Sequence, residues 1–248
     1  MAHVVLVHGN PETTAIWDPL IAALGRDDVE ALSPPGFGAA VPEGFGATTD
    51  DYVAWLVGEL QPKGAPVDLV GHDWGGGHVM RVAIERPDLI RSWVIDIAGC
   101  FAPDYVWHES AQAWQTPDVG EQAVVRMMST PQDIASAVES RGMSADIARR
   151  VVAAFNDDMG RCILALYRSA AQPIMARVGD QLPAAAVRPG LVIIPTADDA
   201  TGGESRARWA AERAGAQVAV LPGLGHWWMI QDPIAGAAAL RTFWSSIA

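Results

Sequence analysis

The stretch Gly71-His72-Asp73-Trp74-Gly75-Gly76 follows the apolar run of residues 67–70 and precedes residues 77–84, whose apolar side chains recur with helical spacing. This order predicts a strand, a sharp turn and a helix. Small residues on both sides of Asp73 allow a strained turn that lifts the central side chain out of the sheet, as in the G-x-S-x-G motif. Where that motif carries a serine, this chain carries an aspartate.

An aspartate at this turn restricts the electrophile that it can attack. A carboxyl group with a reference pKa of about 3.9 is already ionised at neutral pH, so it needs no base to become a nucleophile. Attack on an ester carbonyl would give an anhydride with little gained, whereas attack on a saturated carbon gives an ordinary ester that activated water can cleave. Alkyl halides and epoxides are therefore the expected substrates. The alternative is that Asp73 caps the following helix, but capping requires neither the flanking glycines nor Trp74.

The composition limits the class of protein and its partners. At 248 residues the chain is most simply one domain, and half of its residues are apolar. A net charge of −12 argues against nucleic acid and anionic membrane surfaces as partners. No apolar run is long enough to span a bilayer, no secretory signal is recognisable, and Cys100 and Cys162 match no metal or redox spacing. We expect a cytoplasmic protein without metal or cofactor, acting on a small apolar organic substrate and water, in an oligomeric state that the sequence does not indicate.

Strand-like runs alternate with helical patterns, which predicts a mostly parallel sheet covered by helices. The expected strands are residues 4–7, 29–32, 67–70, 90–98, 191–194 and 217–221, and one of the expected helices begins at an N-cap at Asp50. Residues 101–182 are helical in pattern and contain no strand-like run. We therefore expect a helical cap over residues 101–182, inserted into a core formed by residues 1–100 and 183–248.

Polar residues follow several of the expected strands, and ligands of open parallel sheets bind at that edge. The first strand is followed by His8-Gly9-Asn10-Pro11-Glu12, the strand at 191–194 by Asp198 and Asp199, and the last strand by a glycine-rich loop that contains His226. Together with Asp73, these loops supply a nucleophile, an acid and a histidine in the chain order of an α/β-hydrolase.

On these motifs the chain resembles the haloalkane dehalogenase and epoxide hydrolase group of α/β-hydrolases over nearly its whole length. The resemblance implies an α/β-hydrolase fold in which the first two family strands are absent, leaving about six. It also implies that Asp73 is the nucleophile and that His226 is the base that activates water against the alkyl-enzyme ester. For the acid that orients His226, Asp199 fits the spacing better than Asp198, and Asp104 is a third possibility.

Two further positions distinguish the activities within this group. The backbone N–H groups of Asn10 and Trp74 would form the oxyanion hole, and their side chains resemble one of the N–H pairs with which haloalkane dehalogenases hold the leaving halide. The set Asn10, Asp73, Trp74, Asp199 and His226 then resembles a complete dehalogenase site. We expect carbon–halogen hydrolysis as the first choice.

Epoxide hydrolases instead protonate the opening ring from two cap tyrosines. Tyr167 resembles one of them, whereas Ala113 stands near the comparable position of the other. Tyr105 lies in the same segment at a spacing that does not match, and Tyr167 could equally pack its ring in the core of the cap. Epoxide opening by Asp73 and Tyr167 is the second hypothesis. A non-catalytic protein of the same fold that binds a small ligand is the third.

Overall fold

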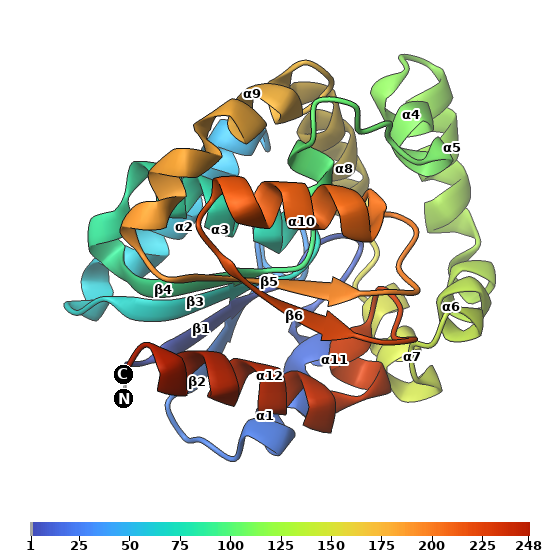
Figure 1. Cartoon of the computed structure of the whole chain (residues 1–248). Coiled ribbons are helices and arrows are strands. Elements are labelled where there is room, and N and C mark those ends of the chain that lie inside the picture. The colour runs from blue at the N-terminus through green and yellow to red at the C-terminus, as the bar shows by residue number, and fades with distance from the viewer. Residues whose placement is uncertain (1) are drawn as a thin grey trace.

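The computed structural model describes residues 2–248 and contains a six-stranded sheet with helices on both faces (Figure 1). Every strand pairing is parallel, and the order across the sheet is β2-β1-β3-β4-β5-β6. The strands are β1 Val4–Val7, β2 Val29–Leu32, β3 Val67–Gly71, β4 Ile90–Ile95, β5 Gly190–Pro195 and β6 Gln217–Leu221. The predicted α/β fold with a parallel sheet of six strands is confirmed.

The α-helices that cover the sheet are α1 Asp18–Leu24, α2 Thr49–Leu60, α3 Trp74–Glu85, α10 Gly203–Arg213, α11 Trp228–Gln231 and α12 Pro233–Ser246. Between β4 and β5 lie α4 Glu109–Gln115, α5 Val119–Ser129, α6 Pro131–Ser140, α7 Ala145–Val152, α8 Asp157–Ser169 and α9 Ile174–Gln181. Short 3-10 helices are η1 Thr14–Trp17, η2 Gln61–Lys63, η3 Pro87–Leu89, η4 Ala98–Phe101 and η5 Leu182–Val187. Among residues 2–248, none of the helices combines the length and apolarity that crossing a membrane requires.

The alternation of side chains along the strands builds two apolar layers. In β1, Val5 and Val7 pack with the helices α2, α3 and α10, whereas Val4 and Leu6 face the opposite layer with α1 and α12. Figure 1 shows these two groups of helices on opposite sides of the sheet. Because the central strands are buried on both faces, they are apolar almost throughout.

Besides one-residue extensions of β3 and β5, two element boundaries differ from the prediction. The strand expected over 90–98 ends at Ile95, because the chain leaves the sheet at the buried Asp96 and begins η4 at Ala98. The N-cap of α2 is Thr48 and not Asp50, since Thr48 and Asp51 form a reciprocal capping box.

We call residues 101–182 the cap. Its helices α4 to α7 lie beyond the arrowheads of β5 and β6, at the carboxyl edge of the sheet (Figure 1). This edge is where loops from β1, β3, β4, β5 and β6 meet, so the cap roofs the region in which the sequence-predicted polar residues gather.

Candidate active site

Asp73 stands at the strained turn between β3 and α3. Its backbone angles are φ 47° and ψ −127°, a conformation that L-residues adopt only when the surrounding structure holds them in it. A Cβ on Gly75 would collide with the carbonyl oxygen of Val7, and one on Gly71 would collide with Gly75. Glycine at these positions therefore lets α3 pack directly against the strands. The side chain of Asp73 makes no capping hydrogen bond to α3, so the alternative of a capping role is wrong.

The carboxylate of Asp73 is partly buried and accepts a hydrogen bond on one side. The backbone N–H of Asn10 donates to its Oδ2 at 3.1 Å. Burial raises the pKa of Asp73, while the charge of His226 and the backbone N–H of Trp74 oppose that rise. The two N–H groups expected to form an oxyanion hole thus both act on this carboxylate. Oδ1 has no hydrogen-bond partner among residues 2–248.

His226 faces this carboxylate from the loop after β6. Its Nδ1–H donates to Asp198 Oδ2 at 2.8 Å, which leaves Nε2 as the nitrogen that can accept a proton. Burial and the neighbouring charge of His72 lower the pKa of His226, but Asp198 and Asp73 outweigh them, so the pKa lies above its ordinary value. His226 can therefore act as a general base through Nε2 once the pH is high enough for the imidazole to lose its proton.

Asp198 is the partner of His226. Its side chain is buried, and its Oδ1 also accepts a hydrogen bond from the N–H of Ala200 at 2.9 Å. Burial would raise the pKa of Asp198, but the charge and hydrogen bond of His226 hold it below its ordinary value. A buried, ionised carboxylate fixes both the orientation and the tautomer of the imidazole.

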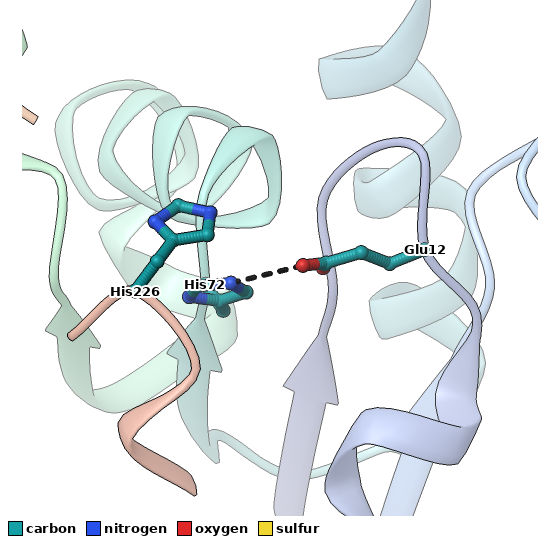
Figure 2. A group of neighbouring side chains, drawn as sticks. All are labelled: Glu12, His72 and His226. Atoms are coloured by element: carbon teal, nitrogen blue, oxygen red, sulfur yellow. Dashed lines mark hydrogen bonds and ion pairs between the residues drawn. The ribbon is translucent and has the colours of Figure 1, made fainter. Parts of the chain in front are cut away.

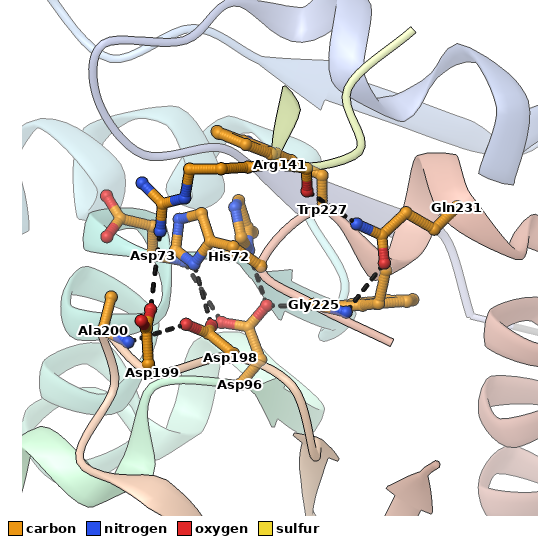
Figure 3. Close-up of polar contacts among 12 residues, drawn as sticks. His72, Asp73, Asp96, Arg141, Asp198, Asp199, Ala200, Gly225, Trp227 and Gln231 are labelled. Carbon is orange, nitrogen blue, oxygen red and sulfur yellow. Dashed lines mark hydrogen bonds and ion pairs between the residues drawn. The ribbon is translucent and has the colours of Figure 1, made fainter. Parts of the chain in front are cut away.

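The prediction that Asp199 orients His226 is wrong. The Asp199 side chain is 93% exposed and lies 3.6 Å from the guanidinium of Arg141 in the cap. Figure 3 shows this ion pair beside the contact of Asp198 with Ala200. A tight turn after β5, closed by the N–H of Asp198 bonding to Pro195, directs neighbouring side chains to opposite sides. Asp104, the third possibility, pairs with Arg206 at the surface, 3.0 Å away.

Asp73 lies where two hollows meet. The inner pocket is lined largely by aromatic and apolar side chains that include Trp74, Trp107 and Tyr167. The outer cleft contains Asn10 and His226 and opens toward Arg141 of the cap. The side of Asp73 that faces the inner pocket is therefore apolar, whereas the side that faces the outer cleft is shared with His226.

Two side chains with N–H donors near Asp73 have no hydrogen-bond partner among residues 2–248. Asn10 is only 7% exposed, yet neither atom of its side-chain amide is hydrogen-bonded, and the buried indole N–H of Trp107 is also unpartnered. The Trp107 ring stacks on Trp74 with centroids 5.8 Å apart. Since unsatisfied buried donors are costly, they point to a ligand that accepts hydrogen bonds. No residue spacing in the sequence marks Trp107 as a donor.

Tyr167 lines the same two hollows as Asp73. It is buried and contacts Trp74 edge to face at 5.2 Å. Burial raises the pKa of Tyr167 well above its ordinary value, so the phenol keeps its proton. Tyr105 also lines the inner pocket, but its hydroxyl already donates to the carbonyl of Ala200 at 2.8 Å. One tyrosine is therefore free to donate to a substrate, and a second is occupied.

A buried charged network lies beneath His226 and consists of Glu12, His72 and Asp96. His72 Nδ1 bonds to Asp96 at 2.6 Å and its Nε2 to Glu12 at 3.2 Å. Burial alone would lower the pKa of His72, but the two carboxylates raise it well above its ordinary value, so the ring is an imidazolium. The sequence did not predict this network, because its members lie on three separate loops.

Within residues 2–248, three side chains of this region lie close enough together to resemble a metal site. Donor atoms of Glu12, His72 and His226 lie within 4.8 Å of one another (Figure 2). A metal-binding histidine must be neutral and offer a free lone pair. Both nitrogens of His72 bind carboxylates, and Nδ1 of His226 binds Asp198. The group therefore fits a hydrogen-bonded ionic network and does not fit a metal centre.

The cap is attached to the loop that carries His226. Gln231 donates from Nε2 to the carbonyl of Arg141 at 3.0 Å and accepts at Oε1 from the N–H of Gly225 at 2.7 Å (Figure 3). The guanidinium of Arg141 also lies over the ring of Trp227, 5.6 Å from its centroid. Arg141 thus contacts Trp227 directly and is linked through Gln231 to Gly225, the two chain neighbours of His226.

The chain is similar in sequence and in fold to known hydrolases. The chain matches the model of the alpha/beta hydrolase family over residues 4–240. It is 30% identical over 199 residues to haloalkane dehalogenase 2 of Mycobacterium tuberculosis, covering 77% of this chain and 69% of that protein. An epoxide hydrolase of Caballeronia sordidicola is 28% identical over 102 residues, 36% of this chain and 29% of that protein. The solved structure of haloalkane dehalogenase DbeA from Bradyrhizobium elkani has a TM-score of 0.75 at 21% identity, covering 99% and 90% of the two chains.

Proposed function

Since the chain belongs to the alpha/beta hydrolase family and is a hydrolase, we propose that it hydrolyses carbon–halogen bonds through a covalent ester on Asp73. The observation that carries this proposal is the surroundings of the Asp73 carboxylate. Among residues 2–248, one oxygen accepts a hydrogen bond from the Asn10 backbone, the other accepts none, and the side-chain N–H groups of Asn10 and Trp107 have no partner. The similarity to a haloalkane dehalogenase of Mycobacterium tuberculosis supports the same substrate class.

In the first step, Asp73 Oδ1 attacks the saturated carbon that bears the halogen. A carbon–oxygen bond forms as the carbon–halogen bond breaks, and the bonding electron pair leaves with the halide. The side-chain N–H groups of Asn10, Trp74 and Trp107 are the candidates that stabilise this halide. The apolar walls of the inner pocket hold the alkyl group in line with the attacking oxygen.

In the second step, His226 Nε2 removes a proton from water, whose oxygen attacks the ester carbonyl carbon of Asp73. Negative charge develops on Oδ2, which the backbone N–H groups of Asn10 and Trp74 stabilise. The bond between Cγ and Oδ1 of Asp73 then breaks, so that Oδ1 leaves with the alkyl group as an alkoxide, which takes the proton from His226 and departs as the alcohol. The water oxygen remains in the carboxyl group of Asp73, which loses its proton to solvent. Asp198 stabilises the imidazolium that forms between these events.

Tyr167 favours a second candidate function, the opening of epoxides. Its protonated phenol lines the pocket with Asp73 and could donate to the ring oxygen as the carboxylate attacks carbon. The alkyl-enzyme ester and its hydrolysis by His226 would be unchanged. The two functions therefore differ only in the leaving group and in the side chain that stabilises it.

Product analysis separates these functions. Purified protein is incubated with 1-bromobutane and, separately, with 1,2-epoxyhexane, and bromide and diol are measured. We expect bromide release with wild-type protein, a loss of about 100-fold when Asn10→Ala removes a donor, and a smaller effect of Tyr167→Phe. Diol formation without bromide release, abolished by Tyr167→Phe, would overturn the dehalogenase proposal in favour of epoxide opening.

A further inference from the structure

Glu12 makes contacts that no role in the proposed chemistry requires. It is 1% exposed, and its carboxylate accepts three hydrogen bonds: from the backbone N–H of Gly9 at 3.2 Å, from His72 Nε2 at 3.2 Å and from the indole N–H of Trp227. These donors come from the loops after β1, after β3 and after β6. A single buried carboxylate thus connects three loops that lie far apart in the sequence.

Each of these donors is the chain neighbour of a candidate catalytic residue. Gly9 precedes Asn10, His72 precedes Asp73, and Trp227 follows His226. A shift of Glu12 would therefore be transmitted directly to the oxyanion donor, the nucleophile and the base.

Asp96 supports the same loops from the other side of His72. Its Oδ2 accepts from His72 Nδ1 at 2.6 Å and from the indole of Trp228 at 2.7 Å, and its Oδ1 accepts from the backbone N–H of Asp73 at 3.2 Å. His72 thus joins the two carboxylates, and all polar atoms of its ring are used. Such a fully satisfied buried network holds its members in one arrangement.

We propose that Glu12 is a positioning residue of the catalytic centre, which holds the loops of Asn10, Asp73 and His226 in their mutual arrangement through Gly9, His72 and Trp227. This inference rests on the proposed function for the roles of the three residues. The contacts of Glu12 themselves do not depend on which substrate is used.

The charge of Glu12 has a second consequence for His226. The titratable and charged groups that surround this histidine are Asp73, Asp198, Glu12, His72, His108 of the cap, and Arg141 above Trp227. Among them, the Glu12 carboxylate favours the protonated imidazole, whereas the His72 imidazolium disfavours it. Removing the charge of Glu12 should therefore lower the pH at which His226 titrates.

Glu12→Gln tests the proposal because it keeps the size of the side chain. Its amide has one acceptor oxygen and an NH₂ group that would face donors, so at least one of the three loops loses its hydrogen bond. We expect kcat to fall by about 100-fold, as for a small misplacement of reacting groups, with a smaller change in KM. The midpoint of the His226 titration, followed by ¹H–¹⁵N NMR of the histidine rings, should move to lower pH.

Glu30→Gln is the matched control, since Glu30 is a half-exposed carboxylate paired with Lys63 and His3 away from the site. It should change neither kcat nor the His226 titration. A folded Glu12→Gln protein with wild-type kcat and an unchanged His226 midpoint would overturn the proposal. If that variant does not fold, Trp227→Phe removes a single donor to Glu12 and should lower kcat more than it changes KM; wild-type kinetics would again overturn it.

The two readouts separate this proposal from the proposed function. If wild-type protein releases neither halide nor diol, the proposed function fails. The NMR titration of His226 and hydrogen exchange at the Gly9 amide still decide whether Glu12 holds these loops. Unchanged titration and exchange in Glu12→Gln would reject the role of Glu12 by itself.

Discussion

At the scale of single residues, two adjacent aspartates after β5 differ in their surroundings. Asp198 is buried and bonds to His226, whereas Asp199 is exposed and faces Arg141. Asp198→Asn should slow hydrolysis of the alkyl-enzyme ester by about 10³- to 10⁴-fold, because the imidazole loses its orienting charge. Since Asp198 raises the pKa of His226, the remaining activity should titrate at lower pH. Single-turnover kinetics across pH measure both effects.

Asp199→Asn is the control for that variant. It removes a charge one position along the chain and should leave the rate of ester hydrolysis within a factor of about two, as expected for an exposed ion pair. Equal losses in the two variants would contradict the assignment of Asp198.

We expect the ionised carboxylate of Asp73 to lower the free energy of unfolding. Because burial raises its pKa, folding favours the protonated carboxyl. The ionised form therefore costs stability at every pH above the unfolded-state pKa of about 3.9, and this cost disappears as the pH falls below that value. Asp73→Asn should abolish turnover yet raise Tm at pH 7, with the difference vanishing near pH 3. Thermal unfolding across pH measures this, and a lower Tm at pH 7 would contradict it.

The sequence predicted the residues whose position follows from a strand end, and it missed those that depend on distant contacts. Asp73 and Tyr167 line both of the hollows that meet at Asp73, Trp74 lines the inner one, and Asn10 and His226 line the outer one. The choice between Asp198 and Asp199 depended on the direction of a turn, which residue spacing does not specify. The links of His72 to Glu12 and Asp96 span 60 and 24 positions, so no local pattern marks them.

At the scale of elements, all six strands could be predicted from short apolar runs that alternate with helical patterns along the chain. Buried parallel strands have this form because they are short apolar segments between turn residues. The first residue of a helix depended on which of several neighbouring polar side chains forms the capping hydrogen bond. Thr48 caps α2 in place of Asp50 because only a residue three positions before Asp51 can form the reciprocal pair. How α4 to α9 pack against one another was beyond the sequence, since their apolar faces allow many pairings.

The capping box gives a prediction for α2. Thr48→Ala should lower the free energy of unfolding by about 1 kcal/mol, because it leaves an N–H of the first turn without its partner. Activity should not change, since α2 contributes no residue to the catalytic set. Urea unfolding measures the loss. Asp50→Asn should change the stability by less than about 0.5 kcal/mol; a larger loss in this control than in Thr48→Ala would contradict the observed helix start.

At the scale of the whole molecule, the cap and the sheet meet at His226. Gln231 joins the Arg141 carbonyl of the cap to the Gly225 N–H of the histidine loop. Gln231→Ala should lower the stability by about 1 to 2 kcal/mol, since it leaves two backbone groups unpaired, and should reduce kcat by slowing ester hydrolysis. Gln217→Ala, which removes only an exposed hydrogen bond to Ser246, is the control. An unaffected rate in Gln231→Ala would show that the cap does not restrain His226.

The central claim is that Asp73 forms a covalent ester that His226 hydrolyses. The direct test is mass spectrometry of His226→Gln after reaction with 1-bromobutane, since this variant retains the nucleophile and lacks the base. We predict a mass increase of one butyl group, found on the peptide that contains Asp73 and absent when Asp73→Asn is added. Unmodified protein after exposure to a panel of haloalkanes and epoxides would contradict the claim and favour a protein that only binds a small ligand.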